Sequence, residues 1–189
     1  GGFFCRVGGF PARARRGPPG VSGFGQELQG RTWRMAKLTL AIHVRNSHLS
    51  SRGGDPFARV QHPDMFADFV MANPPFNIKD WARSESDPRW KYGVPPAGNA
   101  NYAWIQHILS KLAAGGSAGV GMANGSMSTS SGGEGEIRAQ IVEADLVSCM
   151  IALPTQLFRS TGTRGGPGFF ATERAARAAP SPRWTGLRA

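Results

Sequence analysis

Short apolar segments alternate with amphipathic segments through the middle of the chain, and this alternation constrains the fold more than any other feature. The strand-like segments are residues 68–72, 118–123 and 146–153. Between them, residues 100–113 and 136–145 carry apolar side chains at helical spacing. Strands separated by helices predict βαβ units and a parallel sheet. The predicted fold class is therefore α/β, in which ligands bind beyond the carboxyl ends of the strands.

The helical segments also have recognisable ends. Residues 100–113 predict a helix that stops at Gly115-Gly116, and Pro154 is expected to end the last strand. Residues 32–43 predict an earlier helix, which Thr32 can cap. The residues predicted to face inward from the two later helices are Ile105, Ile108, Leu109, Leu112, Ile137 and Ile141.

Charge and composition divide the chain of 189 residues into three regions. Residues 1–26 are rich in Gly, Pro and Arg, with four arginines and no acidic residue, and residues 159–189 are similar, with six arginines and one acidic residue. Residues 27–158 are nearly balanced, so the tails carry most of the net charge of +10. A basic tail can bind phosphates, or it can be solvated disorder. An out-of-frame reading of GC-rich DNA would also produce such tails.

Several classes of protein are not favoured by this composition. The chain has no run of about 18 apolar residues, which a membrane-spanning helix needs. Its two cysteines and four histidines show no spacing typical of a metal site, so we expect no bound metal. A reducing, cytoplasmic location is the default for such a chain. The absence of an initiator methionine suggests a fragment.

The sequence Asn73-Pro74-Pro75-Phe76 follows directly after the apolar segment 68–72. Two prolines fix φ and remove two N–H donors, so the turn is stiff and offers acceptors: its carbonyl groups and the Asn73 amide. Phe76 adds a flat aromatic face beside those acceptors. Acceptors for an exocyclic amine next to an aromatic ring suit a planar amino-bearing ring. The motif alone leaves open an ordinary proline-rich turn, which its place after a strand makes less favoured.

At this point the sequence resembles a known family. Asp/Asn-Pro-Pro-Tyr/Phe after a strand is the signature of amino methyltransferases that use S-adenosylmethionine, and over about residues 22–162 the chain resembles the modification (methyltransferase) subunit of type I restriction–modification systems. The other runs that carry this resemblance include Gly25-Gln26-Glu27, Trp33-Arg34-Met35-Ala36, Gly54-Asp55, Asp87-Pro88-Arg89-Trp90-Lys91-Tyr92-Gly93, Gly98-Asn99-Ala100-Asn101-Tyr102-Ala103-Trp104 and Gly133-Glu134-Gly135-Glu136-Ile137-Arg138.

The resemblance implies methylation of adenine N6 in DNA after the base has been flipped out. The catalytic residues would then be Asn73, Pro74, Pro75 and Phe76. The Asn73 side-chain oxygen and the Pro74 carbonyl would accept hydrogen bonds from the N6 amine, and Phe76 would stack on the base. No cysteine stands in a Pro-Cys context, which argues against cytosine C5 chemistry.

The resemblance also implies a cofactor, S-adenosylmethionine, and its binding residues. Glu27 would bind the ribose hydroxyls, Asp55 would contact the adenine amino group, and Gly1 and Gly2 would end the glycine-rich loop around the methionine part. Asn73 would border the same cofactor. The implied partners are DNA, a specificity subunit and a restriction subunit. Two alternatives stay open: an Asn-Pro-Pro enzyme that methylates protein glutamine or RNA, and an inactive truncated or frameshifted remnant.

In this family the strand order is 3-2-1-4-5-7-6, which implies a gap in the present chain. The chain begins at the end of the glycine-rich loop, so the methyltransferase sheet is expected to be incomplete and to lack strand 1. The sequence Thr163-Arg164-Gly165-Gly166-Pro167-Gly168 breaks the pattern of strand 7, so that strand is expected to be missing too. Both strands are interior, and unpaired edges weaken a sheet. We therefore expect the isolated chain, a partial catalytic domain over residues 27–158, to be poorly stable and inactive.

Overall fold

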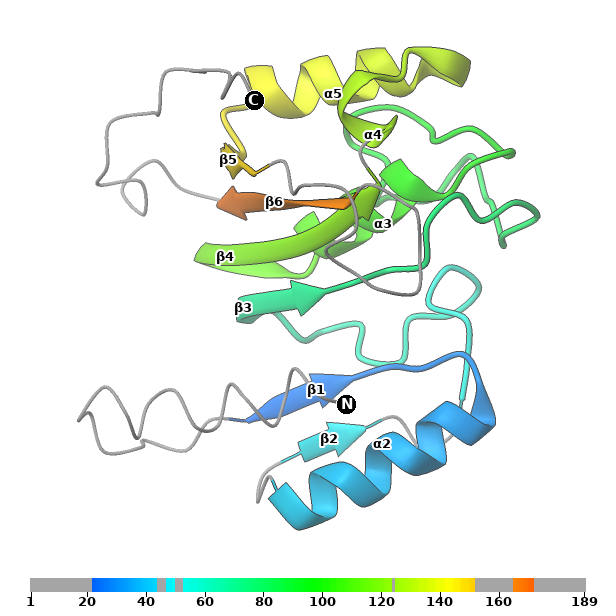
Figure 1. The fold of residues 1–189 in the computed structure, drawn as a ribbon, viewed down its shortest axis with the longest axis vertical. Coiled ribbons are helices and arrows are strands. Elements are labelled where there is room, and N and C mark those ends of the chain that lie inside the picture. The colour runs from blue at the N-terminus through cyan, green and yellow to red at the C-terminus, as the bar shows by residue number, and fades with distance from the viewer. Residues whose placement is uncertain (1–21, 44–46, 50–52, 124, 152–164, 172–189) are drawn as a thin grey trace. The chain divides into compact units, whose positions relative to one another are not determined.

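Two compact units, Gly1–Asp64 and Met65–Ala189, make up the chain (Figure 1). The structure is a computed structural model, and it describes residues 22–43, 47–49, 53–123, 125–151 and 165–171. Each unit contains a sheet of its own, and no described strand pairs with both sheets. The predicted α/β class is confirmed, because helices connect parallel strands in both units.

The first unit contains one parallel βαβ element. Strand β1 (Gly23–Gly25) pairs in parallel with β2 (Ser47–Leu49), and helix α2 (Gly30–His43) supplies the long connection that parallel strands require. The predicted helix over residues 32–43 is confirmed, but its cap is not. The Trp33 amide donates to the Gln29 carbonyl at 2.8 Å, so the helix begins earlier and Thr32 lies inside its first turn.

The second unit contains a mixed sheet in the order β3-β4-β6-β5. Strands β3 and β4 are parallel, whereas β6 is antiparallel to both of its neighbours. The elements in chain order are β3 (Ala67–Ala72), α3 (Asn101–Leu109), β4 (Leu112–Ala123), α4 (Gly125–Ser128), the 3-10 helix η1 (Ser131–Gly133), α5 (Glu134–Glu143), β5 (Val147–Met150) and β6 (Gly165–Ala171).

The core of the second unit lies among β4, α3 and α5. Its buried side chains are Tyr102, Ile105, Ile108, Leu112, Ala118, Val120, Met122, Ile137 and Ile141. Burial of each large aliphatic side chain stabilises the fold by about 1.5–3 kcal/mol relative to exposure. The predicted inward faces of the two helices are therefore confirmed at Ile105, Ile108, Ile137 and Ile141, with Leu109 partly buried.

The boundary between α3 and β4 differs from the prediction. The helix ends at Leu109, and Leu112 already begins β4, which includes Gly115 and Gly116. A Cβ at Gly116 would lie 2.9 Å from the carbonyl oxygens of Ala67 and Ala113. A side chain at Gly116 would therefore clash with the backbone at the irregular start of the β3–β4 ladder. The glycines thus allow the two strands to approach each other, and they do not end the helix as predicted.

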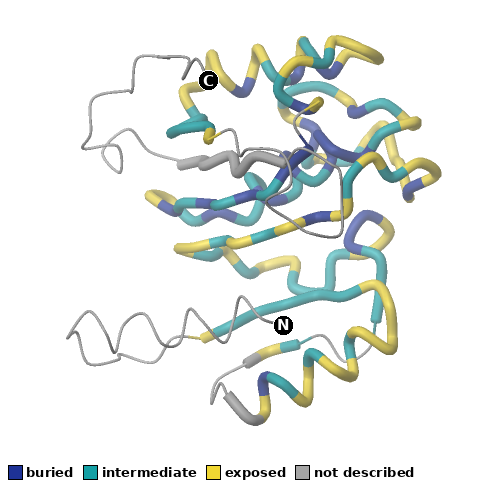
Figure 2. Tube along the Cα trace, in the orientation of Figure 1, coloured by how far each residue is buried: buried dark blue, intermediate teal, exposed yellow. Residues whose placement is uncertain are grey.

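Strand β3 is less buried than a central strand, and Figure 2 shows it mostly in the colours of exposed and intermediate residues. Phe69 is 80% exposed and Met71 is 53% exposed. The sequence predicts a buried strand here because its residues are apolar. Among the described residues, however, β3 pairs only with β4 and lies at the edge of its sheet.

Strand β6 is the main correction to the predicted fold. The sequence predicts that the last strand is missing, yet residues of the run Gly165-Gly166-Pro167-Gly168 form β6 together with Phe169, Phe170 and Ala171. This run has no strand-like alternation, and its proline cannot donate to a ladder. It becomes a strand because β4 and β5 each pair with it, a stabilisation that local sequence does not reveal.

The two sheets can be compared with the order that the resemblance implies. The first has the order β1-β2, corresponding to strands 2 and 3, and the second has the order of strands 4-5-7-6. The described residues provide no counterpart of strand 1. Among the described helices, none has the length and apolar character that crossing a bilayer would require.

Candidate functional site

The Asn-Pro-Pro-Phe turn (residues 73–76) leaves the carboxyl end of β3, as predicted. Strand β3 lies beside the parallel strand β4 (Figure 1), and its last residue, Ala72, pairs with Val120. Asn73 is exposed, Pro74 is buried and Phe76 is partly buried. The turn therefore stands where two parallel strands end, which is the usual ligand-binding edge of such a sheet.

A glycine on the neighbouring strand leaves room for the Asn73 side chain. A Cβ at Gly121 of β4 would lie 2.8 Å from Asn73 Oδ1 and 3.5 Å from its Cγ. Side-chain Cβ atoms essentially never approach a heavy atom so closely. Gly121 thus permits the amide to lie against β4. Sequence reasoning missed this residue, because the contact links positions far apart in the chain.

The chain after the turn is held by a buried asparagine. Asn77 has a left-handed backbone with φ of 55°, and its N–H donates to Asn101 Oδ1 at 2.9 Å. Asn101 Nδ2 donates in return to Asn77 Oδ1 at 2.9 Å and to Ser126 Oγ at 3.0 Å. The Tyr102 hydroxyl donates to the Ser126 carbonyl at 2.6 Å. This asparagine clamp (Asn77, Asn101, Tyr102, Ser126) links the loops that follow β3 and β4.

Tyr102 and Ser126 of the clamp are well shielded from solvent, at 3% and 5% exposed. Burial raises the pKa of the Tyr102 hydroxyl, which suits its role as a neutral donor. Sequence reasoning missed Asn101 and Ser126 as functional candidates. The available signal was a polar residue at the start of an otherwise apolar helix, but nothing local identifies its partners.

In the first unit, Glu27 and Asp55 lie on the two loops that follow the parallel strands β1 and β2. Glu27 Oε1 accepts from the Gln29 amide at 3.1 Å, and Asp55 Oδ1 accepts from the Phe57 amide at 2.8 Å. Each carboxylate thus has one oxygen bonded to its own loop. The second oxygens, Oε2 and Oδ2, have no hydrogen-bond partner among the described residues.

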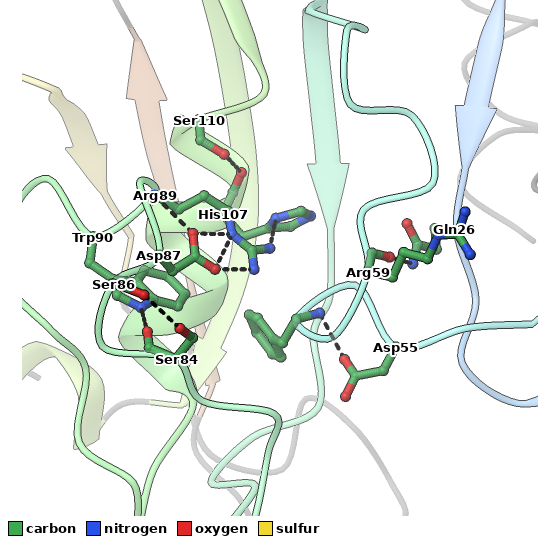
Figure 3. A network of polar contacts seen from close by, with 11 residues as sticks. Gln26, Asp55, Arg59, Ser84, Ser86, Asp87, Arg89, Trp90, His107 and Ser110 are labelled. Atoms are coloured by element: carbon green, nitrogen blue, oxygen red, sulfur yellow. Dashed lines mark hydrogen bonds and ion pairs between the residues drawn. The ribbon is translucent and has the colours of Figure 1, made fainter.

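The two loops are bonded to each other, so Glu27 and Asp55 are brought to one edge of the sheet. The Gly54 amide donates to the Glu27 carbonyl at 2.9 Å. Gln26 braces the same junction: its Nε2 donates to the carbonyls of Gly54 at 3.1 Å and Arg59 at 2.8 Å. Figure 3 shows Gln26, Asp55 and Arg59 in this network. Gly1 and Gly2, also predicted at the cofactor, lie outside the described residues.

The loop before α3 contains a charged cluster that is satisfied internally (Figure 3). Arg89 Nε donates to both oxygens of Asp87, at 2.9 and 3.0 Å, and Arg89 Nη1 lies 2.9 Å from His107 Nδ1. Because arginine only donates, His107 must accept with Nδ1 and stay neutral. Burial, together with the Arg89 charge, lowers the pKa of His107 to about 4, and the Arg89 hydrogen bonds lower the pKa of Asp87.

This cluster holds the loop on α3 and does not form a site of its own. Trp90 Nε1 donates to the Ser84 carbonyl at 2.7 Å, and Trp81 packs edge-to-face on Trp90. Gln106 of α3 accepts from the Tyr92 amide at 3.0 Å. The part of the chain that the structure describes has no group of three or more His, Cys, Asp or Glu side chains arranged to hold a metal ion.

Comparison with known proteins shows the family of this chain. The family model described as N-6 DNA Methylase matches residues 1–179. The type I restriction enzyme HindI methylase subunit of Haemophilus influenzae is 45% identical over 163 residues, which are 85% of this chain and 37% of that protein. The MjaIX methylase subunit of Methanocaldococcus jannaschii is 40% identical over 146 residues, 73% of this chain and 26% of that protein.

A solved structure shows the same relationship. The type I restriction-modification methyltransferase subunit of Streptococcus thermophilus superposes with a TM-score of 0.73 at 28% identity, covering 84% of this chain and 35% of that one. The chain therefore spans roughly a quarter to two fifths of the length of these relatives.

Proposed function

Because this chain belongs to the N-6 DNA methylase family, we propose that it transfers a methyl group to the N6 atom of adenine in DNA as part of a type I modification subunit. The observation that carries the proposal is the Asn-Pro-Pro-Phe turn at the carboxyl end of β3, with Asn73 exposed beside Gly121.

The turn suits recognition of an exocyclic amine. Asn73 Oδ1 and the Pro74 carbonyl oxygen accept the two N6 hydrogens, which draws the nitrogen lone pair out of conjugation with the ring. Pro74 and Pro75 keep these acceptors rigid, so little reorganisation is needed during the reaction. Phe76 stacks on the base, which must leave the duplex to reach the turn.

S-adenosylmethionine is the proposed methyl donor: when bound it would supply an electrophilic methyl carbon, whose bond to sulfur breaks as its bond to N6 forms, and the methylated amine then loses one N6 proton to water. The donor set of the first unit fits the nucleoside part of such a molecule. Glu27 Oε2 can accept from a ribose hydroxyl, and Asp55 Oδ2 can accept from an adenine amino group, while their other oxygens are held by the loops. Both carboxylates follow parallel strands, at the ligand-binding edge.

The proposed partners are DNA together with a specificity subunit and a restriction subunit. We place sequence recognition outside this chain, since the proposed roles of its site residues concern only the flipped adenine and the cofactor. The excess of arginine in residues 1–26 and 159–189 would favour phosphate contacts if these segments lie near DNA.

The test is methyl transfer to unmethylated DNA, with N6-methyladenine measured by mass spectrometry. The purified chain is assayed alone and with the specificity and restriction subunits of a type I complex. We expect Asn73→Ala to lower the rate on the order of a hundredfold or more, because an acceptor that acts in the transition state is lost. Gln140→Ala, which removes an exposed amide on α5, is the matched control and should keep the wild-type rate.

Two outcomes would contradict the proposal. Methylation of a protein glutamine or of RNA, with DNA unmodified, would favour the related Asn-Pro-Pro enzymes. A folded chain that methylates none of these substrates, even with the partner subunits present, would favour the inactive remnant.

A further inference from the structure

We infer that Asn101 is the positioning residue of the Asn-Pro-Pro-Phe turn, an inference that rests on the proposed function. Asn101 begins α3 and is only 2% exposed. Its side chain reaches two loops: Oδ1 accepts from the Asn77 amide, and Nδ2 donates to Asn77 Oδ1 and Ser126 Oγ. Both amide hydrogens and the carbonyl oxygen are therefore used, and no other residue type of this size offers the same set.

The Asn-Pro-Pro-Phe turn must be held in place by hydrogen bonds to residues outside it. Pro74 and Pro75 have no N–H groups, so they cannot bind the turn to its surroundings through backbone donors. The Asn77 amide is among the first donors after them, and Asn101 takes it at 2.9 Å. Asn77 also has a left-handed backbone, φ 55°, which a residue with a side chain adopts at a cost and keeps only where its surroundings hold it.

The same side chain connects the turn to the end of the next strand. Ser126 lies on α4, directly after β4, and is 5% exposed. Asn101 Nδ2 binds its hydroxyl, and the neighbouring Tyr102 binds its carbonyl at 2.6 Å. The start of α3 therefore joins the loops at the carboxyl ends of both parallel strands. Asn101 sets where the chain emerges from the two prolines, and with it where Asn73, Pro74 and Phe76 stand.

The decisive variant is Asn101→Leu, which is close in size and removes the acceptor of the Asn77 amide together with both donors. The Asn77 amide, Asn77 Oδ1 and Ser126 Oγ would then all lose their partner. Asn77→Gly is the second variant: Asn77 is exposed, glycine tolerates φ of 55°, and only the side-chain bond is lost. The comparison variant is Gln106→Leu, because Gln106 is a buried amide of the same helix that binds a different loop, through the Tyr92 amide and the Gly93 carbonyl.

Two measurements separate positioning from general stability. Site-resolved hydrogen exchange of the full chain should show the Asn77 amide exchanging on the order of tenfold faster in Asn101→Leu, with helix α5 unchanged. In Gln106→Leu the faster exchange should appear at Tyr92 instead. In the methylation assay, Asn101→Leu and Asn77→Gly should lower kcat about tenfold or more with the same KM for S-adenosylmethionine, since the turn and not the cofactor pocket has moved.

Unchanged exchange at Asn77 in Asn101→Leu would overturn the inference, and so would an unchanged kcat of both variants in a chain that methylates adenine. If Asn101→Leu does not fold, Asn77→Gly decides on the same two measurements. If the wild-type chain methylates nothing, the proposed function fails by itself, and the exchange at Asn77 still decides whether Asn101 holds the turn.

Discussion

At the scale of single residues, the candidate site depends on acceptors that are kept in place by small or rigid neighbours. Asn73 can lie against β4 only because position 121 has no side chain. Glu27 and Asp55 keep one oxygen each for their own loops, which orients the other oxygen. Each of these contacts can therefore be tested by a single substitution.

Gly121→Ala should displace the Asn73 side chain without unfolding the protein. The new Cβ would lie 2.8 Å from Asn73 Oδ1, and the exposed side chain can rotate away. We expect methyl transfer to fall on the order of tenfold to a hundredfold, because misplacing a reacting group by about 1 Å has effects of that size. Thermal unfolding should change little. Gly98→Ala is the control, since a Cβ there meets nothing within 4 Å.

Glu27→Ala should weaken binding of S-adenosylmethionine, because the Oε2 acceptor for a ribose hydroxyl is removed. The loss of a charged hydrogen-bond partner predicts a dissociation constant raised about tenfold or more, measured by calorimetry. Gln29→Ala removes an exposed neighbour of the same loop and serves as the control. Equal binding by the wild-type chain and Glu27→Ala would mean that Glu27 does not hold the cofactor.

At the scale of elements, the long connection between β3 and α3 is held by polar contacts in addition to apolar packing. Asp87 and Arg89 form an ion pair whose side chains are only 12% and 10% exposed, and His107 on α3 accepts from Arg89. Arg89 can make both contacts only when His107 is neutral and Asp87 is ionised. The stability of the connection between β3 and α3 should therefore depend on pH.

The free energy of unfolding should fall as the pH is lowered from about 6.5 towards 4. The folded protein protonates His107 only near pH 4, whereas an unfolded chain does so near pH 6.5, so the unfolded state binds more protons between these values. The loss can reach about 3 kcal/mol at the lower end. Asp87, whose pKa is below its usual value, adds a further loss at still lower pH.

Urea unfolding at a series of pH values measures this dependence. His107→Asn keeps an acceptor for Arg89 and cannot be protonated in this range, so its curve should be flatter between pH 6.5 and 4. Asp87→Asn should keep the slope in that window. A wild-type slope unaffected by His107→Asn would assign the acid sensitivity to other groups.

At the scale of the whole molecule, each of the two units has a sheet of its own, and β3 presents apolar side chains at the edge of the second sheet. Phe69 and Met71 of β3 are 80% and 53% exposed, and Phe66, directly before the strand, is 63% exposed. A strand edge with exposed apolar side chains is a template for pairing with another chain. The isolated chain is therefore expected to self-associate.

Phe69→Lys should reduce that association, because an edge lysine opposes pairing between strands. Sedimentation velocity over a range of concentrations should show less of the larger species, with an unchanged circular dichroism spectrum. Ala97→Lys adds the same charge at an exposed loop position and should have no such effect. Association that persists equally in both variants would place the contact elsewhere.

Much of the fold and part of the site follow from local patterns. The helical spacing of Ile137 and Ile141 depends on neighbours within two turns, so their inward face could be predicted. The position of Asn73 at a strand end follows from the apolar segment before it and the prolines after it. Glu27 and Asp55 could be proposed only from a resemblance, and their roles stay predictions.

Other features depend on contacts between distant segments, which local sequence does not reveal. Residues 165–171 form a strand because β4 and β5 pair with them, although their own composition opposes it. Asn101 lies 24 residues from Asn77 and 25 from Ser126, and no periodicity connects these positions. Local sequence is enough to predict helices α3 and α5, strand β3 and the turn, since these depend on backbone preferences and apolar spacing nearby. The tertiary structure decided which buried polar groups hold the turn, because hydrogen-bond partners are chosen by packing.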